Sequence, residues 1–573
     1  MSGSTTRWVT RACVAFIFPV LASCGGDDGG GGGEPPPPAG DITVSGRITY
    51  ERVPFSSTPG NGLDYSRMVA LPARAIVVEL IDAANQAILR TTTSTTAGDY
   101  SFTAPPDTNV FVRAKARSTD PATGGAAGSW DLLVRNNTNG DALYALDSAP
   151  FNTGRASQVR DLFAASGWAV FAGEYTGARA AAPFAILDTL YAATQFVLAN
   201  GAGDEAFPPL GAFWSTANKP FAGDVAAGEI GSTGYVPGTG IYVLGWADGG
   251  AASDTDEFDP HVIAHEFQHY LEEQVARADT VGGNHGPGDR LDLRVSFSEG
   301  YANAFSAMVL DDPVYRDSLG SRQADEFSFD VEGNAWTHPG WFSEGSVQSI
   351  AWDLFDAANE AGDAVTTGFG PLYEVFKAEL VAGQALTSLF PFVVALKSRP
   401  GVNATDVEAL VARQAIVANP MDAFATTEVN FGGSCPSTPP VPAADRCDVL
   451  PIYTALPLNA GTPVAVCGNG LAGTYNRIGN RRFLTFSVPD ARPVTITVQA
   501  LPDPAAPAPD PDLVIFRAGV GFFDSSENAG PSETYSGSLP AGDYVLEVYE
   551  YDHVDPAGPE PRPRTCMNVT ING

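Results

Sequence analysis

The chain has 573 residues, of which 44% are hydrophobic and 17% are charged, a composition typical of globular domains. Its length is sufficient for roughly three or four such domains. The formal net charge of −34 at pH 7 favours solubility and argues against binding to nucleic acid or to anionic lipid head groups.

The first 23 residues have the features of a signal peptide rather than of a domain. Arg7 and Arg11 precede an apolar run over residues 12–21, which is too short to span a bilayer. The run leads into Leu-Ala-Ser-Cys, which resembles a bacterial lipobox and implies cleavage before Cys24 and lipidation of that residue. An ordinary signal peptide with an incidental cysteine is the alternative. We expect an exported protein of the bacterial cell envelope, held at the outer membrane or cell surface by its N-terminal lipid alone.

Two segments with different compositions follow. Residues 24–40 are rich in glycine and proline and predict a tether that is flexible in its glycine part and extended by its prolines. Residues 41–117 alternate apolar and polar side chains in short runs separated by turn signals, which predicts a small β-sandwich. The order V-x-G-x-I, V-x-L-x-D and G-x-Y-x-F resembles the carboxypeptidase-regulatory or transthyretin-like module. We expect a spacer or substrate-presenting domain.

Residues 118–433 form the predicted central domain, and its most informative stretch begins at Asp259. This residue is a good helix N-cap, and a proline follows it at the first helical position. A helix from there places His265 and His269, four residues apart, on one face, where two imidazoles can bind one metal ion. Glu266 can then reach a water on that ion. This is the H-E-x-x-H pattern of zinc hydrolases, in which the glutamate is the general base.

A catalytic zinc ion usually has three protein ligands, so a third ligand is expected elsewhere in the chain. Glu299 is the best candidate, because residues 295–305 predict the start of a second amphipathic helix that carries it. Asn303, one turn further, can accept an N–H from a ligand imidazole and fix its tautomer. The alternative to a metal site is a pair of partly exposed histidines on a surface helix.

With these motifs the chain resembles the gluzincins, the thermolysin-like zinc peptidases with H-E-x-x-H on one helix and a glutamate on the next. The resemblance implies an α+β metallopeptidase domain in which His265, His269 and Glu299 bind one catalytic zinc ion and Glu266 is the base. Asn303 departs from it, because many relatives carry an aspartate there. Arg290 and Arg294 occupy the region before Glu299, where thermolysin has an oxyanion-binding tyrosine.

His338 is a further candidate for catalysis. It precedes a helical pattern at residues 346–356, and thermolysin-like enzymes carry an oxyanion-binding histidine in a similar place. A structural histidine in a turn is the alternative. Further helices are predicted at residues 182–198, 371–382, 387–397 and 405–418.

Other polar residues near the motif remain open to two interpretations each. Asp254, Asp256, Glu257 and Asp259 form an acidic cluster that suits calcium, although a solvated acidic turn is favoured. His261 lies one turn before His265, too far along the helix to share its metal ion. His285, in a glycine-rich loop at residues 282–289, either contacts substrate or is solvated. The strand at residues 241–245 is either an edge strand that binds an extended substrate or a plain core strand.

The last part of the chain contains the remaining cysteines. Cys435, Cys447, Cys467 and Cys566 suggest two disulfides in an oxidising compartment; of the three possible pairings we favour 435–447 with 467–566. Zinc ligation by these four is the alternative, although paired C-x-x-C spacing is lacking. Residues 434–455 predict a linker. Residues 456–573 return to a β pattern whose F-L-T-F-S-V-P, P-D-L-V-I-F and L-P-A-G-D-Y-V-L-E-V stretches resemble the bacterial pre-peptidase C-terminal domain, an accessory β-sandwich.

Together these features predict a multidomain protein in which an α+β gluzincin-type metallopeptidase domain is flanked by two small β-sandwich domains. The expected activity is zinc-dependent hydrolysis of peptide bonds in protein or peptide substrates. Two alternatives stay open: a non-catalytic surface binding protein or adhesin with a degenerate peptidase fold, and a zinc hydrolase that acts on a non-peptide bond. The sequence does not indicate an oligomeric state.

Overall fold

A computed structural model describes residues 40–120, 128–201, 203, 205–247, 250–357, 364–433, 446–501, 509–555, 557 and 564–573, with Arg446 and Cys447 as backbone only. The described residues from Asp41 onward form one unit. The predicted signal peptide, Cys24 and the tether up to residue 39 lie outside the described residues.

The first sheet is built around β1 (Ile42–Arg52). Its even-numbered side chains Ile42, Val44, Ile48 and Tyr50 are buried, the alternation expected of a strand with one face on a core. Four short strands pair with β1, namely β2 (Val69–Pro72), β5 (Asp99–Ala104), β11 (Gln158–Val159) and β12 (Leu162–Ala164).

The second sheet has ten strands and crosses the predicted boundary between residues 117 and 118. That boundary falls within β6 (Asn109–Thr119), which pairs with β3 (Ile76–Asp82) on one side and with β7 (Asp131–Asn136) on the other. Strands from both sides of the boundary therefore share one sheet. Its other members are β4 (Ile88–Thr93), β8 (Ala142–Leu143), β9 (Ala145–Asp147), β10 (Phe151–Asn152), β15 (Leu210–Trp214), β16 (Gly234–Val236) and β17 (Gly240–Val243).

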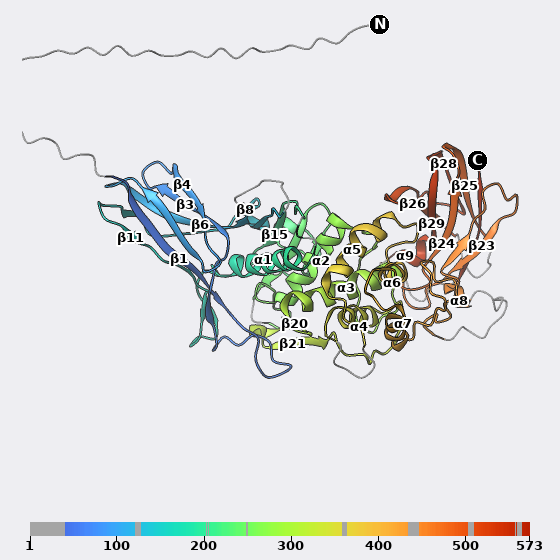
Figure 1. Ribbon diagram of the computed structural model, residues 1–573, viewed down its shortest axis with the longest axis horizontal. Coiled ribbons are helices and arrows are strands. Elements are labelled where there is room, and N and C mark those ends of the chain that lie inside the picture. Colours follow the sequence, from blue (N-terminus) through green and yellow to red (C-terminus); the bar gives the residue numbers. More distant parts are fainter. Residues whose placement is uncertain are drawn as a thin grey trace, which may run out of the picture. The chain divides into compact units, whose positions relative to one another are not determined.

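Helix α2 (Pro260–Val275) packs against α3 (Leu293–Leu310), which packs against α4 (Glu344–Phe355) (Figure 1). Gly300 permits the close approach of α3 and α4, because a Cβ there would lie 2.5 Å from the carbonyl oxygen of Glu344. The helices are α1 (Ala182–Asn200), α2 (Pro260–Val275), α3 (Leu293–Leu310), α4 (Glu344–Phe355), α5 (Phe369–Val375) with a π-helical continuation (Phe376–Leu380), α6 (Leu389–Lys397) and α7 (Ala404–Arg413). The helices predicted from apolar periodicity are confirmed.

Among the described residues, α1 is long and apolar enough to cross a membrane by length and composition. Within the fold, 67% of its most apolar window is buried, as in the core helix of a globular domain.

A small sheet borders the helices and contains β18 (Gly245–Trp246), β19 (Asp254–Thr255), β20 (Val314–Leu319) and β21 (Asp325–Asp330). The remaining short elements in this part of the chain are β13 (Trp168–Ala169), β14 (Glu174–Tyr175) and the 3₁₀ turns at Asn137–Asn139, Val225–Ala227 and Ser321–Gln323.

Residues 453–572 form two further sheets that enclose a separate apolar core. One sheet contains β22 (Tyr453–Ala455), β24 (Arg481–Val488), β26 (Pro511–Arg517), β27 (Gly521–Ser526) and β29 (Gly542–Glu550). The other contains β23 (Val464–Gly468), β25 (Arg492–Ala500), β28 (Ser532–Leu539) and β30 (Thr565–Asn572), and two short helices, α8 (Arg446–Val449) and α9 (Tyr551–Val554), flank the strands. We call these two sheets the C-terminal sandwich.

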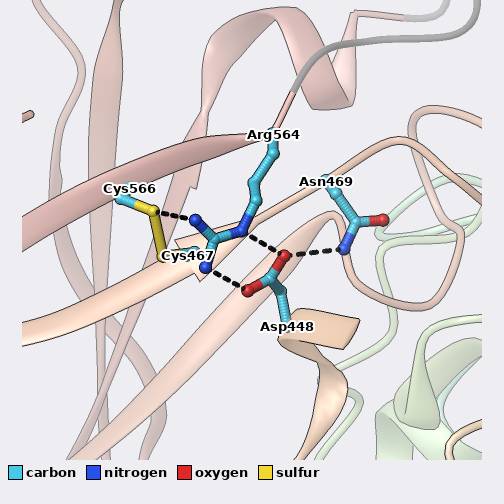
Figure 2. Close-up of a disulfide and its surroundings, with 5 residues drawn as sticks. All are labelled: Asp448, Cys467, Asn469, Arg564 and Cys566. Carbon is cyan, nitrogen blue, oxygen red and sulfur yellow. Dashed lines mark hydrogen bonds and ion pairs between the residues drawn. A yellow bond between two sulfur atoms is a disulfide. The ribbon is translucent and has the colours of Figure 1, made fainter. Parts of the chain in front are cut away.

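A disulfide joins Cys467 on β23 to Cys566 on β30, so this half of the favoured pairing is confirmed (Figure 2). Arg564 donates to Asp448 and to the sulfur of Cys566 beside it. Because these two sulfurs bond to each other, the alternative of zinc ligation by four thiolates is wrong. The predicted bond between Cys435 and Cys447 lies outside the described residues.

Candidate metal centre

Helix α2 begins at the predicted residue, although its N-cap acts differently from the expectation. Asp259 stands at the N-cap and Pro260 at the first helical position. The carboxylate of Asp259 does not cap the helix, because it accepts from the backbone N–H of Ser318, at 2.8 Å, and from the hydroxyl of that serine. The start of α2 is thereby tied to β20.

His265 and His269 lie on the same face of α2, and their Nε2 atoms are 3.1 Å apart. Glu299, in the middle of α3, places Oε2 3.1 Å from Nε2 of His265 and 3.2 Å from Nε2 of His269. Two atoms bound to one tetrahedral zinc ion at about 2.0–2.1 Å lie roughly 3.3 Å apart. The three side chains thus form a group that could hold a metal ion.

Hydrogen bonds outside this group fix the tautomer of His265. Asn303 directs its Oδ1 at Nδ1 of His265, at 2.8 Å, while its own amide nitrogen donates to Gln348 at 2.9 Å. The amide oxygen must therefore accept the Nδ1 proton, which leaves a lone pair on Nε2 of His265 facing Glu299.

His269 is held in the same way by a serine. The hydroxyl of Ser298 donates to Glu272 at 2.7 Å and lies 3.2 Å from Nδ1 of His269, so its oxygen accepts the Nδ1 proton. Burial raises the pKa of Glu272 to about 7, although the charge of His269 and the bond from Ser298 oppose it. Sequence analysis did not identify Ser298 and Glu272, because contacts outside the motif leave no spacing signal.

The electrostatics of the group favour a positive charge at its centre. Burial would lower the pKa of His269, but the charge of Glu299 and its hydrogen bond, with Glu266 and Glu272, raise that pKa to about 9. Two imidazole lone pairs and a carboxylate oxygen within 3.2 Å of one another repel unless a cation lies between them. The donor set of two imidazoles and one carboxylate fits zinc.

Glu266 points into a cavity of about 840 Å³ that the three possible ligands also line. Its Oε2 accepts from the backbone N–H of Tyr235 at 2.7 Å. Tyr235 lies on β16, which is the edge strand of the ten-stranded sheet. The strand predicted as a possible edge, β17, is instead paired on both sides, because residues 234–236 fold back onto it as a hairpin.

The structure brings His285, not His338, to the cavity. Nε2 of His285 lies 3.1 Å from Oε2 of Glu299, and Nδ1 lies 2.5 Å from Oε2 of Glu344. Burial would lower the pKa of His285, but the two carboxylates outweigh burial and hold the pKa well above its usual value. His338 is exposed and contacts the carbonyl oxygen of Gly288, so it does not line the cavity.

Asp256, Glu257 and Asp259 of the acidic cluster are buried and Asp254 is half-buried, so the favoured interpretation as a solvated turn is wrong. Glu257 forms an ion pair with Arg179, and Asp259 is bound by Ser318. His261 is likewise buried, contacts Ser306 at 3.2 Å and lies outside the group formed by the other two α2 histidines.

Asp254, Asp256 and Asp317 form a second group that could hold a metal ion, with one oxygen from each within 4.8 Å of the others. All three line the same cavity as Glu266. Burial, with repulsion from Glu257, raises the pKa of Asp254 to about 6, and burial with repulsion from Asp254 raises the pKa of Asp317 to about 7. Asp256 is 3% exposed and, within the described structure, its Oδ1 has no hydrogen-bond partner. Sequence analysis missed Asp317, which lies 61 residues beyond Asp256.

No family model and no curated protein sequence matches this chain. Among solved structures, the pre-peptidase C-terminal domain of a collagenase from Bacillus anthracis is 15% identical, with 21% of this chain and 93% of that chain covered at a TM-score of 0.15. PliG from Aeromonas hydrophila, a periplasmic inhibitor of g-type lysozyme, is 17% identical, with 21% and 96% covered and a TM-score of 0.14. A cycloisomaltooligosaccharide glucanotransferase from Paenibacillus sp. is 8% identical, with 92% and 72% covered and a TM-score of 0.12. None of these likenesses assigns the chain to a family.

Proposed function

We propose that the chain is a zinc-dependent peptidase of gluzincin type. The observation that carries the proposal is the convergence of His265, His269 and Glu299 from two helices, with Glu266 beside them in one cavity. A purely structural zinc site needs no general base and is usually closed by a fourth protein ligand. This group has three ligand residues and opens onto a cavity large enough for part of a peptide.

His265, His269 and Glu299 would hold the zinc ion, with Asn303 and Ser298 orienting the two imidazoles. A zinc ion bound there would supply Lewis-acid chemistry and lower the pKa of its water to about 7.

Glu266 then acts as the proton carrier. Its carboxylate takes a proton from the attacking water and passes it to the leaving amine, which is the role of a general base followed by a general acid. The N–H of Tyr235 holds one carboxylate oxygen at 2.7 Å and orients the group toward the cavity.

His285 replaces His338 as our candidate for the group that stabilises charge on the scissile carbonyl oxygen. Glu344 holds Nδ1 of His285, so the opposite ring nitrogen faces Glu299 and the cavity. A positioned donor of this kind typically contributes a factor of about 100 to 1000 to kcat.

An extended peptide would lie along β16, whose outer edge is unpaired within the described part of the sheet and whose Gly234 and Tyr235 line the cavity. Strand addition of this kind uses backbone hydrogen bonds for affinity and alternate side chains for specificity.

The rest of the chain supports an exported role. We propose that Cys24 carries a lipid that anchors the protein in the cell envelope, and that the first β domain and the C-terminal sandwich are carboxypeptidase-regulatory-like and pre-peptidase-C-terminal-like. We also propose a hard cation such as calcium at Asp254, Asp256 and Asp317, because carboxylate oxygens are the ligands that calcium prefers.

Digestion of a mixed peptide library by the purified full chain tests the proposal. We expect cleavage that a chelator abolishes and zinc restores. Metal-dependent hydrolysis of esters or other non-peptide substrates, with peptides left intact, would support a different zinc hydrolase. Zinc binding with no hydrolysis of either class would support a binding protein with a degenerate fold.

A further inference from the structure

We infer that the C-terminal sandwich positions part of the catalytic site, because three of its residues hold the loop that delivers His285. This inference rests on the proposed function, in which His285 acts on the substrate. The sequence predicted an accessory β-sandwich here, and no catalytic residue was assigned to it. Tyr475, Asn476 and Arg477, which precede β24, position this loop through hydrogen bonds.

The loop at residues 281–289 has no helix or strand of its own to support it. In the described structure, the hydrogen bonds to its first backbone carbonyls all come from the sandwich. The hydroxyl of Tyr475 donates to Val281 at 3.0 Å, and Nδ2 of Asn476 donates to Gly282 at 2.8 Å and to Asn284 at 3.1 Å.

Arg477 extends this clamp on both sides of His285. Its guanidinium donates to the carbonyl oxygen of Asn284 at 2.9 Å and pairs with Asp289 at 2.8 Å. Backbone hydrogen bonds continue the contact, from the N–H of Ile478 to Arg290 at 2.9 Å. The loop is thus fixed at Asn284, immediately before the histidine, and at Asp289, four residues after it.

Gly283 shows how closely the two parts approach. Its φ of +94° is a conformation that favours glycine, and a Cβ at this position would lie 2.0 Å from Cε1 of Tyr475. Any side chain there would push the loop away from the sandwich, and His285 with it.

The sandwich also holds the helix that carries Glu299. Arg294, in the first turn of α3, pairs with Glu547 of β29 at 2.7 Å, and the side chains are 0% and 3% exposed. Arg481 of β24 reaches the other oxygen of Glu547 at 2.6 Å. A buried pair of this kind resists separation, because breaking it leaves an uncompensated charge. His285 and Glu299 therefore share one support, which keeps their 3.1 Å contact in place.

The test is a double-mutant cycle on the full chain. Asn476→Asp keeps the size of the side chain and removes the two donors to the loop, and Tyr475→Phe removes one donor with the least disturbance of packing. Asn459→Asp is the matched control, because Asn459 is an exposed residue of the same part of the chain whose side chain bonds to the backbone of Gly573, far from the loop.

We expect Asn476→Asp to retain zinc, to lower kcat/KM by roughly 100-fold, the scale of a 1 Å misplacement, and to speed hydrogen exchange over residues 281–289. Tyr475→Phe should lower kcat/KM and speed loop exchange as well, but by smaller factors. Asn459→Asp should change neither kcat/KM nor loop exchange. In a His285→Ala background, Asn476→Asp should lower kcat/KM no further, since its effect passes through that histidine.

An equal loss of kcat/KM with and without His285 would overturn the inference, as would unchanged loop exchange in both sandwich variants. If the parent chain cleaves no peptide, the proposed function fails. The exchange measurement then decides separately whether the sandwich holds the loop.

Discussion

Oδ1 of Asn303 lies 2.8 Å from Nδ1 of His265. Because the amide nitrogen of Asn303 is committed to Gln348, this contact holds the imidazole proton on Nδ1 and leaves Nε2 as a ligand atom. A neutral amide does so without the negative charge that an aspartate would add.

Replacing Asn303 with alanine should weaken zinc binding by about 10- to 100-fold, because the imidazole loses both its orientation and its tautomer preference. Asn303→Asp should bind zinc at least as tightly as the parent. Competition with a chromophoric chelator measures both affinities, and Asn200→Ala, at the exposed end of α1, is the control. An unchanged affinity in Asn303→Ala would show that the contact does not support the metal site.

Substitution of the two candidate histidines should separate their roles. His285→Ala should lower kcat by about 100- to 1000-fold with zinc content unchanged, because it removes a donor from the cavity. His338→Ala should cost much less, since its exposed side chain contacts the carbonyl oxygen of Gly288 and does not line the cavity. Steady-state kinetics on peptides measure both, and the reverse order of effects would restore the role that the sequence predicted for His338.

The group of Asp254, Asp256 and Asp317 should bind a hard cation independently of zinc. Terbium should show luminescence sensitised by Tyr315, which lines the same cavity, and calcium should compete for the site. Calcium at 100 times its Kd should stabilise the fold by about 2.7 kcal/mol.

Asp256→Asn should abolish the terbium signal, and Asp41→Asn, on the exposed start of the first sheet, should not. Displacement of terbium by peptides with lysine or arginine, without competition from calcium, would instead make this group a pocket for basic side chains of the substrate.

The stability of the C-terminal sandwich should fall as pH rises from about 4 to about 7. Burial and repulsion from the surrounding carboxylates raise the pKa of Asp512 to about 7; these neighbours are Asp510, Glu527, Glu533 and Glu550. The pKa in the unfolded chain is about 3.9, so this group favours folding below that pH and the benefit is lost as pH rises through about 7.

Asp512→Asn should therefore have a higher Tm than the parent at pH 8, and the gap should shrink on acidification toward pH 4. The exposed Asp543→Asn should follow the parent at every pH. Thermal unfolding of the parent and both variants across this pH range checks the sign of the change in Tm with pH. A parent that gains stability between pH 5 and pH 8 relative to Asp512→Asn would contradict it.

Local patterns carried enough information to predict the helices and the group they bring together. A four-residue spacing sets the face of α2 on which His265 and His269 lie, whatever surrounds the helix. The amphipathic pattern at residues 295–305 indicated Glu299, and the structure places its Oε2 within 3.2 Å of Nε2 of both histidines.

The features that could not be predicted depend on contacts between distant segments. β6 pairs with strands on both sides of an expected domain boundary, which no local alternation encodes. Asp256 belongs to a possible metal-binding group because β20 places Asp317 beside it. His285 sits in a loop without periodicity, so its place at Glu299 follows from packing against residues 475–477.

The proposed hydrolysis depends most directly on Glu266. Zinc content and peptide turnover, measured on the same preparations of the parent chain and of Glu266→Gln, test it together. We predict one zinc ion per chain in both proteins, and turnover in the parent with a loss of about two to four orders of magnitude in the variant, since general base catalysis contributes roughly 100- to 10,000-fold. Turnover that persists in a zinc-loaded Glu266→Gln chain would contradict the proposed mechanism.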